Sequence, residues 1–115
     1  MIAPPRATAS SAAASFPIVV EAISYVNDML GAAGAGQKEF TEQAWAGDTV
    51  RTILQRFSAR FPKLKEALWD AESGELGPHI EIVFNDTILG IRDSVDTTVH
   101  PNDRIILTGQ YIGGA

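Results

Sequence analysis

The spacing of hydrophobic residues changes several times along the chain, and each change predicts a new element. From Pro17, the segment PIVVEAISYV is rich in β-branched and aliphatic residues and predicts a strand that presents Ile18, Val20 and Ala22 on one face. The next segment, NDMLGAAGAG, predicts a short helical turn that ends at glycines. QKEFTEQAW then predicts a second, weaker strand, and the two strands are expected to form a hairpin joined by the helical turn.

The segment GDTVRTILQRFSARFP predicts the clearest helix of the chain. Its apolar residues recur at helical spacing and form one stripe that must be buried: Val50, Ile53, Leu54, Phe57 and Phe61. Asp48 or Thr49 can accept hydrogen bonds from the first helical amides, and Pro62 is expected to end the helix. The opposite face is expected to lie in solvent and carries Arg51, Gln55 and Ser58.

The segment KLKEALWD predicts a further helical turn whose apolar residues cover the core: Leu64, Leu68 and Trp69. Strict alternation in HIEIVFND then predicts a strand with one buried face: Ile80, Ile82 and Phe84. A tight turn is expected at Asn85 and Asp86, and another at HPND. In the last predicted strand, RIILTGQYIGGA, Ile105 and Leu107 point inward, so that Ile106 and Thr108 point outward.

This order of strands around one amphipathic helix predicts an α+β fold of the β-grasp, or ubiquitin-like, type. We expect a mixed sheet of four or five strands packed on one main helix. The Ala- and Ser-rich residues 1–16 are expected to form a disordered tail rather than a targeting segment. Residues 17–112 then form the domain, and residues 113–115 form a flexible tail that contains a diglycine.

Composition excludes several classes of function. The 115 residues include no cysteine, which removes disulfides, thiolate metal sites and a cysteine nucleophile. The net charge of −5 disfavours nucleic-acid binding, and no apolar run is long enough to cross a membrane. His79 and His100 lie too far apart in sequence to indicate a metal site. We therefore expect no catalytic residue, no metal and no bound cofactor.

Other tempting side chains have plainer interpretations. Trp45 and Trp69 are expected to pack at a sheet edge or a helix end rather than to bind a ligand. The acids Glu72, Glu75 and Glu81 are expected to lie in a solvated loop and on a strand face rather than to form a paired-carboxylate site.

Five motifs in order resemble the MoaD/ThiS family of sulfur carriers, from Pro17 to Gly114. YVNDMLG is similar to the family's LRELLG-type segment, and AWAGDTVRTILQRFSARFP is similar to xAGxTVxxLLxxLxxxxP. IEIVFND resembles the xxVAVNG strand and turn, and HPNDRIIL resembles the xDGDEVxxxPP run before the tail. IGG matches the diglycine end of the family.

The resemblance implies that the C-terminal carboxylate is the working group. In the family, a MoeB/ThiF-type adenylyltransferase uses ATP to make an acyl-adenylate, and a sulfur donor converts it to a thiocarboxylate. On this interpretation Gly114 carries the activated carboxylate, and Gly113 gives clearance because it has no Cβ. Tyr111 and Ile112 become recognition contacts. The protein is then a carrier and a substrate rather than an enzyme, and it is expected in the cytoplasm.

Ala115 departs from the family pattern, because a typical carrier ends at the second glycine. We expect Ala115 to be removed by a peptidase, in some systems a JAMM-type zinc enzyme. On the partner face, Thr108 replaces the apolar anchor that is common in the molybdopterin-synthase type, and Ile106 lies beside it. This weakens the case for docking on a molybdopterin-synthase large subunit, which stays open beside other sulfur acceptors, and Thr108 can equally be an ordinary solvent-facing strand residue. The family is therefore better supported than the pathway.

Two other functions stay open. A ubiquitin-like modifier would join Gly114 to lysines of target proteins, and its chemistry is the same up to the adenylate. A β-grasp interaction module would use its sheet face and never its terminus.

Overall fold

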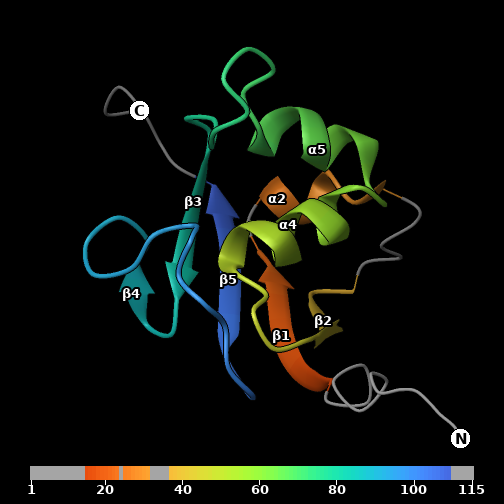
Figure 1. The fold of residues 1–115 in the computed structure, drawn as a ribbon. Helices are drawn as coiled ribbons and strands as arrows, with labels where there is room; N and C mark the ends of the chain where they lie inside the picture. The colour runs from red at the N-terminus through yellow and green to blue at the C-terminus, as the bar shows by residue number, and fades with distance from the viewer. Residues whose placement is uncertain (1–14, 24, 32–36, 110–115) are drawn as a thin grey trace, which may run out of the picture.

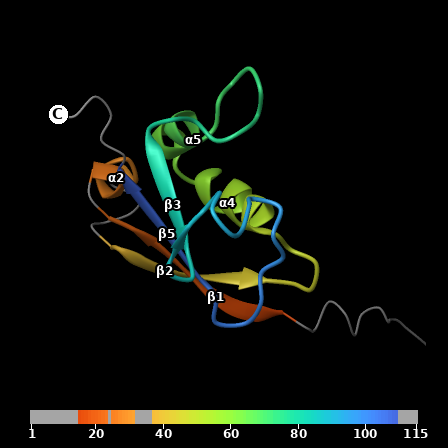
Figure 2. The same cartoon turned by 90° about the vertical axis from the view of Figure 1, so that its left-hand side faces the viewer.

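The computed structural model describes residues 15–23, 25–31 and 37–109, and these form one mixed sheet covered on one face by helices (Figures 1 and 2). The strands are β1 (Phe16–Ala22), β2 (Glu39–Ala44), β3 (Ile80–Phe84), β4 (Thr87–Ile88) and β5 (Arg104–Gly109). The helices are α2 (Tyr25–Asp28), α4 (Val50–Ser58) and α5 (Pro62–Leu68). The sheet order is β2-β1-β5-β3-β4.

The sheet joins the first and last strands of the described chain at its centre. β1 pairs with β2 in an antiparallel hairpin and with β5 in parallel, whereas β3 is antiparallel to β5. This arrangement confirms the expected mixed sheet of four or five strands, with five observed, and the hairpin joined by a short helix. The strand begins at Phe16, one residue before the expected start.

The core lies between the sheet and helices α4 and α5. The residues expected to point inward from the strands are all buried, namely Ile18, Val20, Ala22, Ile80, Ile82, Phe84, Ile105 and Leu107. The stripe of α4 is buried as expected: Val50, Ile53, Leu54, Phe57 and Phe61. α5 adds Leu64 and Leu68 to the same cluster, and Trp69 packs against it partly buried.

The backbone amides at the start of α4 find hydrogen-bond partners in a capping box and in a loop that crosses the helix end. The Thr49 side chain accepts the Thr52 amide at 3.2 Å, and the Thr52 hydroxyl accepts the Thr49 amide at 2.8 Å, which is a capping box. The amides of Val50 and Arg51 donate to the carbonyls of residues 97 and 95 at 3.1 and 2.7 Å. These bonds fix the long loop before β5 against the helix, because helix N-terminal amides have no partner within the helix.

Asp48 links the residues around the start of α4, and its bonds imply a contribution to stability that depends on pH. Its carboxylate accepts hydrogen bonds from the Arg56 guanidinium at 2.7 and 3.2 Å, the Trp45 amide at 2.9 Å and the Thr52 hydroxyl at 2.9 Å. The bonds from Arg56, with smaller help from Trp45 and Thr52, lower the pKa of Asp48 from 3.8 to about 2. Asp48 is therefore held in its charged form in the folded protein.

We expect Asp48→Asn to lower the free energy of unfolding by about 2 kcal/mol at neutral pH. Because the pKa is depressed on folding, this stabilisation is complete above the unfolded value of 3.8 and is lost as pH falls toward about 2. Denaturant unfolding of the parent and the variant at a series of pH values measures the difference between their free energies of unfolding. This difference should vanish as the pH falls through this window. Asp28→Asn, at an exposed position of α2, is the control. A free-energy difference that persists unchanged near pH 2 would contradict the role given to the charged Asp48 carboxylate.

Two details of the helical layer correct the sequence-based expectations. Ser58 was expected in solvent, but it is buried, and its hydroxyl accepts the indole N–H of Trp69 at 3.1 Å. α5 folds back beside α4 and covers that position. Pro62 was expected to end the first helix, but α4 ends at Ser58 and Pro62 begins α5 instead. Proline suits a first helical turn, where its missing N–H costs no helical hydrogen bond.

The turns follow the expected chemistry. Asn85 and Asp86 both have positive φ, 48° and 72°, and join β3 to β4 in a tight hairpin. Asn102, in the turn before β5, has a φ of 69°. Asparagine and aspartate tolerate this left-handed region better than most residues. No helix in the described ranges is both long and apolar enough to cross a membrane.

Candidate functional site

The candidate site is built around the end of β5, the strand that leads to the diglycine. β5 lies in the middle of the sheet, and its last residue, Gly109, pairs with Ile80 of β3. Figure 1 shows its arrowhead next to α2. The predicted residues Tyr111, Ile112, Gly113, Gly114 and Ala115 lie outside the described residues. The structure describes the strand end that leads to them and the surfaces beside it.

Tyr25 of α2 packs directly on Gly109. A Cβ built on Gly109 would overlap the Tyr25 ring, with two further ring carbons only 2.7 Å away. Real Cβ atoms essentially never come this close to another atom, so the ring and a side chain at position 109 exclude each other. The Tyr25 hydroxyl donates a hydrogen bond of 2.5 Å to the carbonyl of His79, just before β3. Tyr25 therefore fastens the end of β5 and the start of β3 together.

The open face of the sheet carries an apolar row beside this strand end. Strand register places Ile106 of β5 next to Val83 of β3, and Val83 next to Ile88 of β4. Ile106 and Val83 are half-buried, and Ile88 is 42% exposed. Ile106 and Thr108 both face away from the core, as expected, and Thr108 lies opposite Glu81. Val83 is thus the centre of an apolar row that has Ile106 at one end and Ile88 at the other, whereas Thr108 adjoins an acid.

A charged cluster borders the apolar row on its other side. The Arg104 guanidinium forms ion pairs with Glu21 at 2.8 Å and Glu39 at 3.0 Å. The hydrogen bond to Glu39, together with Glu21, raises the pKa of Arg104. Two acids around one cation leave this border net negative. A partner that docks on this face thus meets an apolar strip with an acidic margin, which favours a basic surface.

Apart from Glu81, which lies on the strand face opposite Thr108, the side chains considered for other chemistry fall outside this site. Within the described ranges, no group of three or more His, Asp or Glu residues could hold a metal ion. Glu75 pairs with Arg51 at 3.1 Å and helps to fix two loops. The Trp45 ring lies under the Arg56 guanidinium, 5.5 Å from its centroid. Both tryptophans therefore have the packing roles expected for them.

Sequence reasoning missed the contact between Tyr25 and Gly109 and the cluster around Arg104. A glycine inside a predicted strand was the available signal for the first, because glycine in a strand often marks a close approach of another group. The sequence contains no signal for the charged cluster, since its three members come from three strands.

Comparison with solved structures decides the fold. The solution structure of small archaeal modifier protein 1 from Methanosarcina acetivorans matches with a TM-score of 0.70 at 17% identity, over 87% of this chain and 98% of that one. The putative molybdopterin converting factor subunit 1 from Pyrococcus furiosus matches with a TM-score of 0.62 at 17% identity, over 84% and 99%. CysO, an antigen of Mycobacterium tuberculosis, matches with a TM-score of 0.62 at 22% identity, over 82% and 99%.

The chain has the β-grasp fold. The sequence matches no protein-family model and no curated protein. The β-grasp neighbours are matched over almost the whole of their own length, so the likeness covers the complete domain rather than a shared motif. The resemblance inferred from the five motifs is thereby confirmed at the level of the fold.

Proposed function

We propose that this chain is a sulfur carrier of the MoaD/ThiS type, whose Gly114 carboxylate is adenylated and then converted to a thiocarboxylate. The observation that carries the proposal is the position of β5. It is a central strand of a β-grasp domain, it ends at Gly109, and the diglycine comes within the next five residues. Five extended residues span at most about 17 Å, which is enough to bring a carboxylate into an active site on another protein.

The described surfaces supply what such a carrier needs besides its tail. The apolar row of Ile106, Val83 and Ile88 gives an adenylyltransferase of the MoeB/ThiF type a strip to bury, and the acidic border around Arg104 orients it. The net charge of −5 speeds encounter with a basic partner. ATP is consumed by that partner, and this chain acts as its substrate in the cytoplasm.

Two further steps complete the proposal. A peptidase, such as a JAMM-type enzyme, removes Ala115, because the adenylate must form on the second glycine. The thiocarboxylate then passes its sulfur to an acceptor enzyme. Thr108 next to Glu81 makes a polar patch where the molybdopterin-synthase type commonly has an apolar anchor. We therefore favour an acceptor other than a molybdopterin-synthase large subunit.

A second candidate is a protein modifier that joins Gly114 to target lysines. One neighbour in fold is named a small archaeal modifier protein, and the diglycine serves this chemistry equally well. The two candidates diverge only after the adenylate, so the species formed in the cell decides between them.

The test is the intact mass of the protein purified from its native host without reducing agent. A sulfur carrier is expected as a chain that ends at Gly114 with one oxygen replaced by sulfur. Adducts that migrate slowly on a denaturing gel, and that disappear when Gly113 and Gly114 are deleted, would indicate the modifier. A chain that keeps Ala115 under every growth condition would overturn both.

A further inference from the structure

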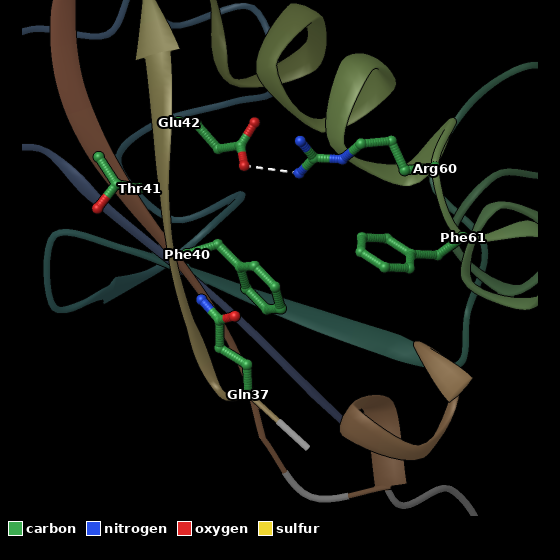
Figure 3. Close-up of a pocket in the computed structure, with 6 residues that line it drawn as sticks. All are labelled: Gln37, Phe40, Thr41, Glu42, Arg60 and Phe61. Atoms are coloured by element: carbon green, nitrogen blue, oxygen red, sulfur yellow. Dashed lines mark hydrogen bonds and ion pairs between the residues drawn. The ribbon is translucent and has the colours of Figure 1, made fainter. Parts of the chain in front are cut away.

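A groove beside the outer edge of the sheet is separate from the tail and from the apolar row. It holds about 370 Å³ and lies between β2 and the segment that joins α4 to α5, where Figure 3 shows its lining. Phe40 and Phe61 form its apolar wall, with ring centroids 6.0 Å apart. The Arg60 guanidinium lies over the Phe61 ring at 5.6 Å and pairs with Glu42 at 2.6 Å.

β2 is an edge strand, and its register decides which backbone groups face the groove side. The Ala22 amide donates to the Lys38 carbonyl at 2.8 Å, so Lys38, Phe40 and Glu42 exchange backbone hydrogen bonds with β1. The backbone groups of the alternate residues, Glu39, Thr41 and Gln43, therefore point away from the sheet.

Side chains cover part of this edge and leave its centre open. The side-chain amide of Gln37 donates to the backbone carbonyl of Glu39 at 2.5 Å, and the Arg56 guanidinium donates to the backbone carbonyl of Gln43 at 3.4 Å. Among the residues that the structure describes, nothing bonds to the amide or the carbonyl of Thr41. Proteins commonly protect edge strands from indiscriminate pairing. Among the described residues, the outward carbonyls of Glu39 and Gln43 are covered in this way, whereas that of Thr41 is not.

The charges around the groove select what can bind there. Of the Arg60–Glu42 pair, the cation is the exposed member, with 52% of its side chain accessible against 12% for the acid. Lys38 is exposed at the other end and has no ion-pair partner within the described ranges. This edge therefore presents two cations in a protein whose net charge is −5. An approaching segment with an acidic residue complements it.

We propose that the β2 edge binds an extended segment of a partner protein, which pairs antiparallel with Thr41. Antiparallel pairing lets a single partner residue bond both the amide and the carbonyl of Thr41, whose carbonyl, unlike those of Glu39 and Gln43, has no side-chain cover among the described residues. The next partner residue lies opposite Phe40 and points into the groove, where an aliphatic side chain fits. Two residues further on, the partner side chain lies opposite Lys38 on the same face, where an acid fits. The partner segment therefore contains an aliphatic residue, then any residue, then an acidic residue.

Two peptides of identical composition test this spacing. Ac-Ser-Thr-Val-Thr-Glu-Ser-NH2 places Val and Glu on one face, whereas Ac-Ser-Thr-Val-Glu-Thr-Ser-NH2 places them on opposite faces. Titration into the ¹⁵N-labelled full chain, followed by amide chemical shifts, should show the first peptide binding about tenfold more tightly, a difference of about 1.4 kcal/mol. The shifts should centre on Thr41. Equal affinities, or shifts elsewhere, would overturn the proposal.

Three variants separate recognition from folding. Thr41→Pro removes the donor at a position where an edge strand tolerates proline, and it should abolish peptide binding while the thermal transition persists. Thr41→Val keeps the backbone and should bind as the parent does. Lys38→Gln should weaken the first peptide by about threefold, the size of one cross-strand charge pair.

Two further measurements show what occupies the β2 edge and whether binding there depends on the C-terminal tail. If the Thr41 amide shifts with protein concentration in the absence of peptide, a second copy of the chain occupies the edge and the proposal fails. A chain that lacks Gly113 and Gly114 should bind the first peptide unchanged, because the edge does not use the tail. This result keeps the test separate from that of the sulfur-carrier function, which the same deletion abolishes.

Discussion

A chain that ends at Ala115 is expected to be adenylated at least about a hundredfold more slowly than one that ends at Gly114. The extra residue moves the carboxylate by about 3.3–3.6 Å along an extended tail. A displacement of about 1 Å at a reacting centre can cost roughly a hundredfold in rate. The added methyl group also meets an active site that, in the proposed reaction, accepts only glycine backbone.

The measurement is ATP–pyrophosphate exchange with the cognate adenylyltransferase and each of the two chains. A third chain that ends at Ile112 gives the baseline without an acceptor glycine. The unfolding temperature of each chain is measured beside its rate, so that a difference in stability is separated from a difference in adenylation. Equal rates for the chains that end at Gly114 and Ala115 would show that no trimming is needed.

Gly109→Ala is expected to lower the same adenylation rate by between about tenfold and about a hundredfold without unfolding the protein. The new Cβ would occupy the space of the Tyr25 ring and force it aside, which also breaks the hydrogen bond to the His79 carbonyl. The end of β5 then loses the side chain that fastens it to β3. Since the diglycine lies within five residues of Gly109, a looser strand end leaves its carboxylate less often in a productive position.

Variants of Tyr25 distinguish positioning from stability. Tyr25→Phe keeps the ring on Gly109 and should retain most of the rate, whereas Tyr25→Ala should lose it. In the double variant Tyr25→Ala/Gly109→Ala the overlap is gone, so the thermal stability should rise above that of Gly109→Ala while the rate stays low. A rate that recovers together with stability would mean that Tyr25 only supports the fold.

The parts of the fold that the sequence predicted are those in which local pattern and burial agree. The four apolar residues of α4 and Phe61 just beyond it recur at helical spacing, and a stripe of that width must be buried against another element. β3 was predictable for the same reason, because strict alternation allows one register with a buried face.

The corrections at Ser58 and Pro62 have a tertiary cause. Periodicity along α4 places Ser58 away from the main stripe, but it cannot show that α5 returns to cover that side and brings the Trp69 indole to its hydroxyl. Proline signals a break in a helix equally well when it starts the next one. The first error came from treating the outer face of α4 as if only solvent lay beside it, and the second from assigning the proline to the wrong helix.

The contacts of the candidate site were beyond the reach of local pattern. Tyr25 and His79 are 54 positions apart, and Glu21, Glu39 and Arg104 meet only because β1, β2 and β5 are neighbours in one sheet. Such pairs depend on strand order and register together. The open backbone groups at Thr41 have the same origin, since a shift of one residue against β1 would turn them inward.

The parallel pairing of β1 with β5 also makes completion of the sheet depend on the last strand that the structure describes. The second strand to leave the ribosome can pair with the first at once, but the centre of the sheet stays empty until β5 has emerged. Contacts between such distant segments form late, because they close the longest loop in the chain. A product cut short before β5 thus has no complete sheet and no docking face. We expect such a fragment to be degraded by proteases, so that, on the proposed function, it does not compete with the complete chain for an activating enzyme.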